Sequence, residues 1–177
     1  MQSINLAELY DAPPMAWQQV HDRLGDGFAQ GPGTEGPGRH TCWVTTLNAD
    51  GSPHANAVGA IWLDDAFWFV TGRLTRRGRN LARDPRCLLA LSLDEFDLVV
   101  EGRAVLITDR DLVAKLAQVY ANDEGWPCSV DASGTAITAP FSAQSAGQPP
   151  WHLYRLQAHS AHAVQTVEPH GATRWHF

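Results

Sequence analysis

Three strand-like segments follow one another in the first half of the chain, separated only by tight turns. Residues 40–47, 53–63 and 66–71 are rich in β-branched and aromatic side chains. Residues 48–51 (Asn-Ala-Asp-Gly) and 64–65 (Asp-Asp) are typical turn sequences. Because connections this short join antiparallel neighbours, the region predicts an antiparallel meander.

The same strand signals return in the second half of the chain. Further strands are expected at 87–93, 98–107, 151–158 and 161–167. A chain of 177 residues, 44% of them hydrophobic, can bury one sizeable core, so a single domain over 1–177 is expected. Six or more antiparallel strands with short helices between them close most economically into a small barrel. The predicted fold class is therefore mainly β, a β-barrel with peripheral helices.

Helical spacing is found in three places. Trp17, Val20 and Leu24 recur as one face of a helix before the first strand. A second helix is expected over 76–83, where Thr75 is placed to cap it. A third begins at Asp109 and covers roughly 110–121, with an apolar face made of Leu112, Leu116, Val119 and Tyr120.

Two segments have the composition of loops. Residues 29–39 are Gly/Pro-rich, so 1–38 is expected to consist of the N-terminal helix and a Gly/Pro loop. Residues 123–150 are rich in Gly, Ser and Pro and predict a long loop. Because long loops are often functional, this one is a candidate lid over a site, with Trp126 and Phe141 as apolar contacts.

Positive charge is concentrated in one segment, 73–86. These fourteen residues hold six of the thirteen Lys and Arg residues and a single acid, a net charge of +5. The other 163 residues carry seven basic and eighteen acidic side chains. Such an island suits one small anion such as a phosphate group, whereas the acidic remainder would repel a long polyanion. Nucleic acid is not an expected partner. The six arginines are Arg73, Arg76, Arg77, Arg79, Arg83 and Arg86.

The start of the expected helix at 76–83 is a candidate phosphate site. Thr75 offers a hydroxyl, the first backbone N–H groups of a helix lack partners, and the helix dipole favours an anion there. Arg76 and Arg77 add guanidinium groups, which bind phosphate in a bidentate way. The alternative is a solvated basic helix whose arginines pair with scattered Asp and Glu. Local sequence leaves both interpretations open.

Other features limit the possible classes of protein. Three widely spaced cysteines without a CxxC pair argue against a structural zinc site or a disulfide framework. The chain shows no signal-peptide pattern and no membrane-spanning run, so a cytoplasmic location without membrane association is expected. The histidines at 152, 159 and 162 lie in expected strands, where a three-residue spacing points two rings to opposite faces. No metal site and no catalytic side chain is assigned.

Several segments, in this order and spacing, resemble the pyridoxamine 5′-phosphate oxidase-like split-barrel family. The resemblance covers roughly residues 38–177. The segments that carry it are 39–54 (RHTCWVTTLNADGSPH), 58–62 (VGAIW), 75–86 (TRRGRNLARDPR), 97–105 (DLVVEGRAV) and 172–177 (ATRWHF).

The resemblance implies a homodimer that binds FMN, or the deazaflavin coenzyme F-420, at the subunit interface. A strand ending in Thr and the turn after it would hold the cofactor phosphate, which here corresponds to Val70, Thr71, Thr75, Arg76 and Arg77. Three residues would lie along the flavin ring: Val58, Gly59 and Ala60. Residues from the partner's C-terminal tail would complete the site, with Arg174 and Trp175 as candidates.

The implied function is a flavin- or deazaflavin-dependent oxidoreductase acting on an unidentified small molecule. Pyridoxamine phosphate oxidases carry an Arg and a Lys on the strand before the phosphate turn, and residues 56–63 contain neither. Oxidation of pyridoxamine phosphate is therefore not the expected activity. The alternative is a non-catalytic split-barrel module that binds flavin or haem for carriage or sensing.

Overall fold

A computed structural model describes residues 1–28, 40–143 and 145–177. Within them lie eleven strands and three α-helices, with a short 3-10 helix at Glu8–Tyr10. The mainly β class is as predicted. The loop expected at 29–39 lies outside the described residues. The α-helices are α1 (Trp17–Gly25), α2 (Arg76–Arg83) and α3 (Arg110–Asn122). The strands are β1 (Gln2–Asn5), β2 (Cys42–Leu47), β3 (Pro53–Val58), β4 (Ala60–Leu63), β5 (Ala66–Gly72), β6 (Arg86–Ser92), β7 (Phe96–Leu106), β8 (Ser129–Val130), β9 (Ile137–Thr138), β10 (Trp151–Gln165) and β11 (Ala172–His176).

The strands close into a barrel through one bent segment. The single long strand expected at 53–63 is wrong, because Gly59 interrupts it. Before the break β3 pairs with β2, and after it β4 pairs with β5. The ring then continues from β5 through β10, β7 and β6 back to β2, and every pairing is antiparallel. The predicted closure of six or more antiparallel strands into a barrel is confirmed, with the bent segment shared between two pairings.

The two closing strands expected at 151–158 and 161–167 are one continuous strand, β10. Its register with β7 shifts between Ala158 and Ser160, which identifies a β-bulge rather than a turn. Gly102 faces this region, where a Cβ atom would lie 2.2 Å from the carbonyl oxygen of Gln157. The extra residue therefore bends the strand without reversing it. Nothing in the sequence at 159–160 distinguishes such a bulge from a turn.

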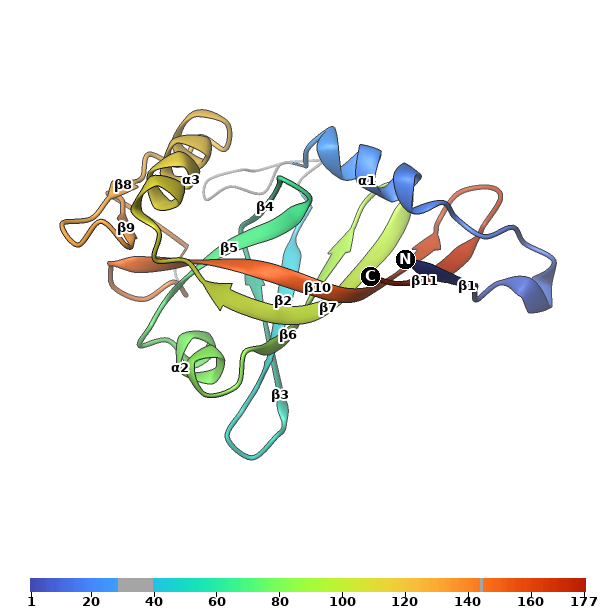
Figure 1. Cartoon of the computed structure of the whole chain (residues 1–177), viewed down its shortest axis with the longest axis horizontal. Coiled ribbons are helices and arrows are strands. Elements are labelled where there is room, and N and C mark those ends of the chain that lie inside the picture. Colours follow the sequence, from blue (N-terminus) through green and yellow to red (C-terminus); the bar gives the residue numbers. More distant parts are fainter. Residues whose placement is uncertain (29–39, 144) are drawn as a thin grey trace.

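Both ends of the chain join the sheet. The C-terminal tail forms β11, which pairs with β10 on one side and with β1 on the other. Figure 1 shows the two termini side by side at this edge. The N-terminal strand was not predicted, because residues 2–5 are too short for a periodic signal.

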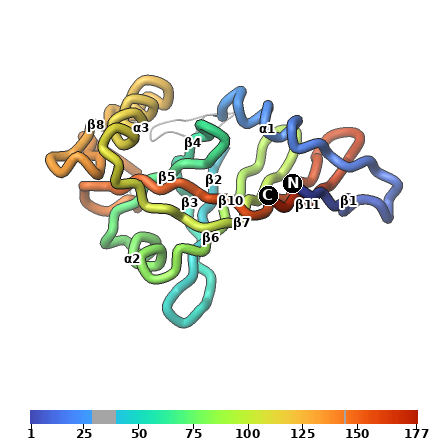
Figure 2. The backbone as a smooth tube through the Cα atoms, viewed as in Figure 1, coloured from blue at the N-terminus to red at the C-terminus, as the bar shows by residue number. Residues whose placement is uncertain are grey.

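The three helices cover different parts of the barrel. In the view of Figure 2, α1 and α3 lie above β10 and α2 lies below it. One core cluster fills the barrel and includes Val20 and Leu24 of α1, as predicted. A second cluster lies between α3 and the outer face of β5 and β10. The buried face of α3 is rotated from the expected one: it consists of Val113, Leu116, Ala117 and Tyr120.

Candidate anion and ring-binding site

The turn from β5 into α2 has the predicted geometry. Thr75 is the N-cap of α2, and its Oγ1 accepts a hydrogen bond from Gly78 N at 3.0 Å. The same hydroxyl donates to Gly72 O at 2.7 Å and lies 3.1 Å from Thr71 Oγ1. Gly78 is needed because a Cβ there would lie 2.2 Å from Gly72 O. The start of the helix is thus packed tightly onto the end of β5.

The six arginines divide into two groups by their partners. Arg86 forms an ion pair with Asp84, with Nη2 and Oδ2 2.7 Å apart. Arg79 donates to Leu74 O, and Arg83 donates to Leu47 O. Within the described residues, no carboxylate pairs with these two, nor with Arg73, Arg76 and Arg77. Pairing with scattered Asp and Glu therefore accounts for only one of the six arginines, and Arg76 and Arg77 lie without a carboxylate partner at the start of α2.

Arg77 is the unusual member, because its side chain is buried. It is 5% exposed, and its guanidinium donates to two backbone carbonyl oxygens, of Val70 at 3.2 Å and of Ala57 at 3.4 Å. Its Nε is buried without a hydrogen-bond partner. Burial lowers the pKa of Arg77 to about 10, so the group stays charged at neutral pH. A buried cation without a counter-charge is costly unless an anion joins it.

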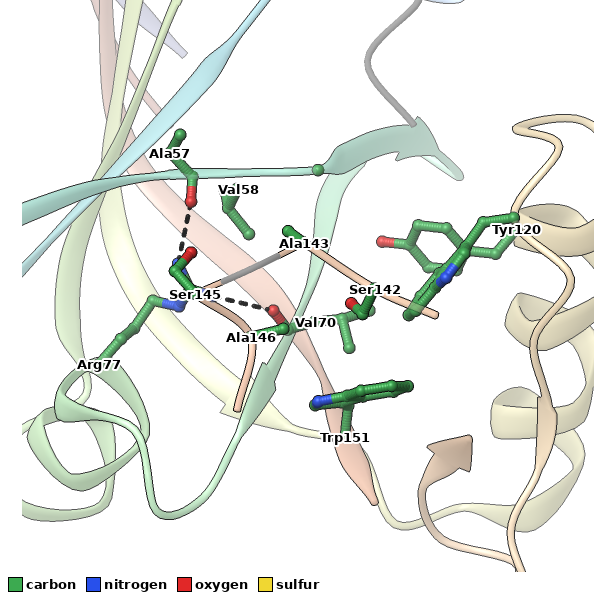
Figure 3. A pocket seen from close by; sticks show the side chains of 12 residues that line it. Ala57, Val58, Val70, Arg77, Tyr120, Ser142, Ala143, Ser145, Ala146 and Trp151 are labelled. Atoms are coloured by element: carbon green, nitrogen blue, oxygen red, sulfur yellow. Dashed lines mark hydrogen bonds between the residues drawn. The ribbon is translucent and has the colours of Figure 1, made fainter. Parts of the chain in front are cut away.

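A small pocket lies beside the Arg77 guanidinium. Its volume is about 50 Å³, and its wall combines the β3–β4 break, β5, α3 and the loop before β10. Figure 3 shows Arg77 reaching up from α2 beneath Ala57, while the rings of Tyr120 and Trp151 lie on the far side of the pocket. The lining residues are Ala57, Val58, Gly59, Val70, Arg77, Tyr120, Trp126, Ser142, Ala143, Ser145, Ala146 and Trp151.

The loop before β10 is held over this pocket at both ends. Trp126 Nε1 donates to Phe141 O at 2.7 Å, and Trp151 Nε1 donates to Gly147 O at 3.0 Å. The two indole rings are 5.6 Å apart and form one wall. Ala146 also packs on the turn between β5 and α2, since its carbonyl oxygen would be 2.8 Å from a Cβ at Gly72. The region 123–150 is not wholly a loop, because it contains β8 and β9.

The predicted site residues fall into four groups. Four of them line the pocket: Val58, Gly59, Val70 and Arg77. Thr71, Thr75 and the exposed Arg76 belong to the adjoining turn, and Ala60 is buried in the barrel core. Arg174 and Trp175 lie elsewhere, on β11. Trp175 is 1% exposed and its ring packs 5.3 Å from that of Trp17, so it is part of its own subunit's core.

Several residues of the site were not found from sequence. Asn56 lies next to the pocket residue Ala57, and its Oδ1 is buried without a partner. His54 lies near Arg76 and Arg77; burial and these two charges lower its pKa. Trp151 and Tyr120 form walls, although their spacing marks them only as ordinary core residues. The absence of Arg and Lys from 56–63 was the one available signal, because it leaves Asn56 as the polar group on that strand.

The described residues contain no group of three or more His, Cys, Asp or Glu able to hold a metal ion. Among the described helices, none is both long and apolar enough to cross a membrane.

Comparisons with known proteins agree on the family and fold. A family model described as pyridoxamine 5′-phosphate oxidase matches residues 35–165. No curated protein matches the chain. General Stress Protein 26 from Bacillus anthracis aligns with a TM-score of 0.55 at 15% identity, over 84% of this chain and 94% of that one. A pyridoxamine 5′-phosphate oxidase-related, FMN-binding protein from Nostoc punctiforme aligns with a TM-score of 0.55 at 13% identity, over 77% of this chain and 80% of that one. A putative pyridoxamine 5′-phosphate oxidase from Listeria innocua aligns with a TM-score of 0.54 at 12% identity, over 81% of this chain and 94% of that one. At these identities the likeness shows the fold, which is the predicted split barrel.

Proposed function

This chain belongs to the pyridoxamine 5′-phosphate oxidase family, and from that premise we propose that it is an FMN-dependent oxidoreductase whose cofactor phosphate binds at the start of α2. The deazaflavin F-420 is the alternative cofactor. The observation that carries the proposal is Arg77, a buried guanidinium without a carboxylate partner among the described residues, placed beside a pocket. A phosphate group is the counter-charge that such a site requires.

The residues present fit the phosphate end of such a cofactor. Arg76 is exposed, and Arg77 Nε is unsatisfied, so donors remain for an anion at the Thr75 turn. Gly59 would let a flat ring approach the backbone of the β3–β4 break. The pocket of about 50 Å³ is far smaller than the roughly 300–1,000 Å³ of ordinary ligand sites. The ring therefore needs Ser142, Ala143, Ser145 and Ala146 to give way, which makes these lining residues the lid of the site.

The chain supplies binding and exclusion of water rather than acid–base groups. When bound, the flavin supplies the hydride chemistry. Among the lining residues only Arg77 and Tyr120 are titratable, and the Tyr120 hydroxyl donates to Trp68 O at 3.2 Å inside the core. A carrier or sensor would use the same pocket, and this lack of acid–base groups favours that second candidate equally. Reduction of bound FMN by a nicotinamide donor, followed by reoxidation by an acceptor, separates the oxidoreductase from the carrier.

We also propose a homodimer, built on the outer face of β2, β6 and β7. Trp43, Ala90 and Val99 are neighbours across these three strands, and Trp43 is 50% exposed. A second copy would cover this apolar row. Trp43→Asp should convert the dimer into a monomer in analytical ultracentrifugation. A wild-type protein that is monomeric at all concentrations would contradict the proposal.

FMN titration of wild type, Arg77→Met and Arg86→Met tests the cofactor site. Methionine keeps an apolar stem but removes the charge, so Arg77→Met should weaken FMN by about 1.5–3 kcal/mol, roughly 10- to 150-fold. Arg86 is exposed and already paired with Asp84, so Arg86→Met should bind like wild type. Thermal unfolding confirms that each variant is folded. Equal affinity of all three proteins, or no binding of either FMN or F-420, would overturn the assignment.

A further inference from the structure

A second and larger cavity, of about 500 Å³, lies at the opposite end of β5 from the arginine cluster. None of its lining residues lines the first pocket. Its walls come from α1, the β4–β5 hairpin, β10 and the chain end. They consist of Trp17, Gln18, His21, Trp62, Asp65, Ala66, Phe67, Val100, Arg155, Leu156, Gln157, Ala158 and Phe177.

The cavity exists because two strands of the barrel separate. β10 pairs with β5 only from Trp151 to Arg155, and its pairing with β11 begins at Ser160. Between these points, at residues 156–158, that side of β10 has no strand partner within the described residues. β5 continues past the last pair to Ala66 and Phe67, which line the opposite wall. Figure 1 shows α1 and the β4–β5 hairpin on the same side of β10, and residues of all three line the cavity.

The walls of the gap are aromatic. Trp62 packs edge-on against Phe67 with centroids 4.9 Å apart, and His21 packs edge-on against Trp62 at 5.8 Å. On the other side Trp17 meets Phe177 at 4.9 Å, and Phe177 is 49% exposed. Trp17 and Trp62 are only half-buried. Half-exposed rings that line a cavity offer flat, apolar contact area to a ligand.

The charged groups that line the cavity are Arg155 and the His21–Asp65 pair, and Gln18 and Gln157 also line it. Arg155 is exposed, with its guanidinium carbon 5.7 Å from the centre of the Trp68 ring, and no described carboxylate pairs with it. His21 Nε2 lies 2.7 Å from Oδ1 of the exposed Asp65, and no described residue bonds Asp65 Oδ2. Asp65 lies in the turn just before β5, three residues from Trp68, which is the register partner of Arg155. Three residues of chain span at most about 10 Å, so Asp65 lies within about that distance of the strand position beside Arg155.

We infer that this cavity binds a flat aromatic compound with a carboxylate at one end and a hydroxyl or amine donor at the other. The carboxylate would form a forked pair with Arg155, the ring would lie among Trp17, Trp62 and Phe67, and the donor would reach Asp65 Oδ2. The inference does not rest on the proposed cofactor, because the two sites share no residue. It gives the protein a ligand site of a different chemical class from the phosphate site.

Isothermal titration with trans-4-hydroxycinnamate tests the inference on the full chain. We expect one molecule bound per chain in the wild type, and at least about tenfold weaker binding in Arg155→Gln. The matched control is Arg103→Gln. Arg103 is also an exposed arginine, on the neighbouring strand opposite Gln157, but it does not line the cavity. Its variant should bind like wild type.

A second variant, Ala158→Trp, tests the cavity itself, because it fills the cavity without changing its charge. Ala158→Trp places a ring inside the gap and should abolish binding of trans-4-hydroxycinnamate, while FMN binding, tested in parallel, stays as in the wild type. Cinnamyl alcohol, which lacks the carboxylate, should bind wild type and Arg155→Gln equally weakly. The inference is overturned if trans-4-hydroxycinnamate does not bind the wild type at about 1 mM. Binding that Arg155→Gln leaves unchanged would overturn it as well.

Discussion

The two ends of strand β5 hold two different kinds of site. At the Val70–Gly72 end, a capped helix start and a buried arginine surround a pocket of about 50 Å³. At the Ala66–Trp68 end, a gap between separated strands leaves about 500 Å³ among aromatic rings. The first end holds a buried charge and is tightly packed, whereas the second is open, aromatic and flanked by exposed charged groups.

The difference lies in how each end is assembled. The turn at the arginine end is one continuous segment, residues 71–78, whose atoms bond to one another, and the pocket beside it also takes walls from the β3–β4 break, α3 and the loop before β10. The aromatic end is assembled from α1, a hairpin, two further strands and the chain end. A turn made by one segment is fixed by its own backbone geometry. A site made by five segments depends on how the whole barrel packs.

The largest expected effect concerns this difference in packing. Gly78→Ala in α2 should destabilise the protein by about 3 kcal/mol, because a Cβ there would lie 2.2 Å from Gly72 O and 2.9 Å from Arg73 Cα. Gly25→Ala at the end of α1 should be stabilising by about 0.5 kcal/mol, since no atom lies within 4 Å of the added methyl group. Urea unfolding measures both. Equal changes in the free energy of unfolding for the two variants would contradict the difference in packing around Gly78 and Gly25.

A smaller effect is expected from removing helix caps, and it tests whether the cap at the arginine end also contributes to ligand binding. Thr75→Val and Asp109→Ala each remove an N-cap side chain that accepts from a backbone N–H, so each should cost about 1 kcal/mol of stability. Only Thr75→Val should weaken FMN, by about fivefold, because Asp109 caps the distant α3. Calorimetric unfolding and FMN titration give the two readouts. An equal loss of FMN affinity in both variants would mean that the cap acts only through stability.

The arginine end was largely predictable from sequence because its determinants are local. Thr75 as cap and the bounds of the helix at 76–83 follow from rules that involve neighbouring residues only, and the structure confirms both. Local rules did not tell which arginine is buried. Arg76 and Arg77 are adjacent, yet only Arg77 faces the carbonyl oxygens of Ala57 and Val70.

The aromatic end could not be predicted, because nothing in the sequence connects its parts. Trp17, Trp62 and Arg155 come from segments far apart in the chain. The gap arises from the β10 register and its bulge near Ala158, where the sequence suggested a turn. Trp175 shows the same limit, because its packing against Trp17 in the core was not predicted. A role for the tail in a partner's site stays a prediction.

The smallest expected effect concerns two histidines whose pKa values are shifted in opposite directions. Burial, followed by the charges of Arg76 and Arg77, lowers the pKa of His54 at the arginine end. The unfolded chain therefore takes up the proton first, and His54 reduces stability as pH falls below about 6.5. At the aromatic end the hydrogen bond to Asp65 raises the pKa of His21. The stabilisation that His21 contributes is complete below about pH 6.5 and is lost as pH rises through the pKa of His21 in the folded protein.

His54→Gln and His21→Gln should therefore change the pH dependence of unfolding in different windows, each by about half a kcal/mol. His54→Gln should lessen the loss of stability on the acid side, and His21→Gln should remove a contribution that the wild type has only at lower pH. Thermal midpoints at about pH 5.5 and about pH 8 measure both effects. Saturating FMN should shrink the His54 effect, because a bound phosphate offsets the charges of Arg76 and Arg77, and it should leave the His21 effect unchanged. If FMN alters the His21 effect instead, the cofactor binds at the aromatic end and the assignment of the two ends is reversed.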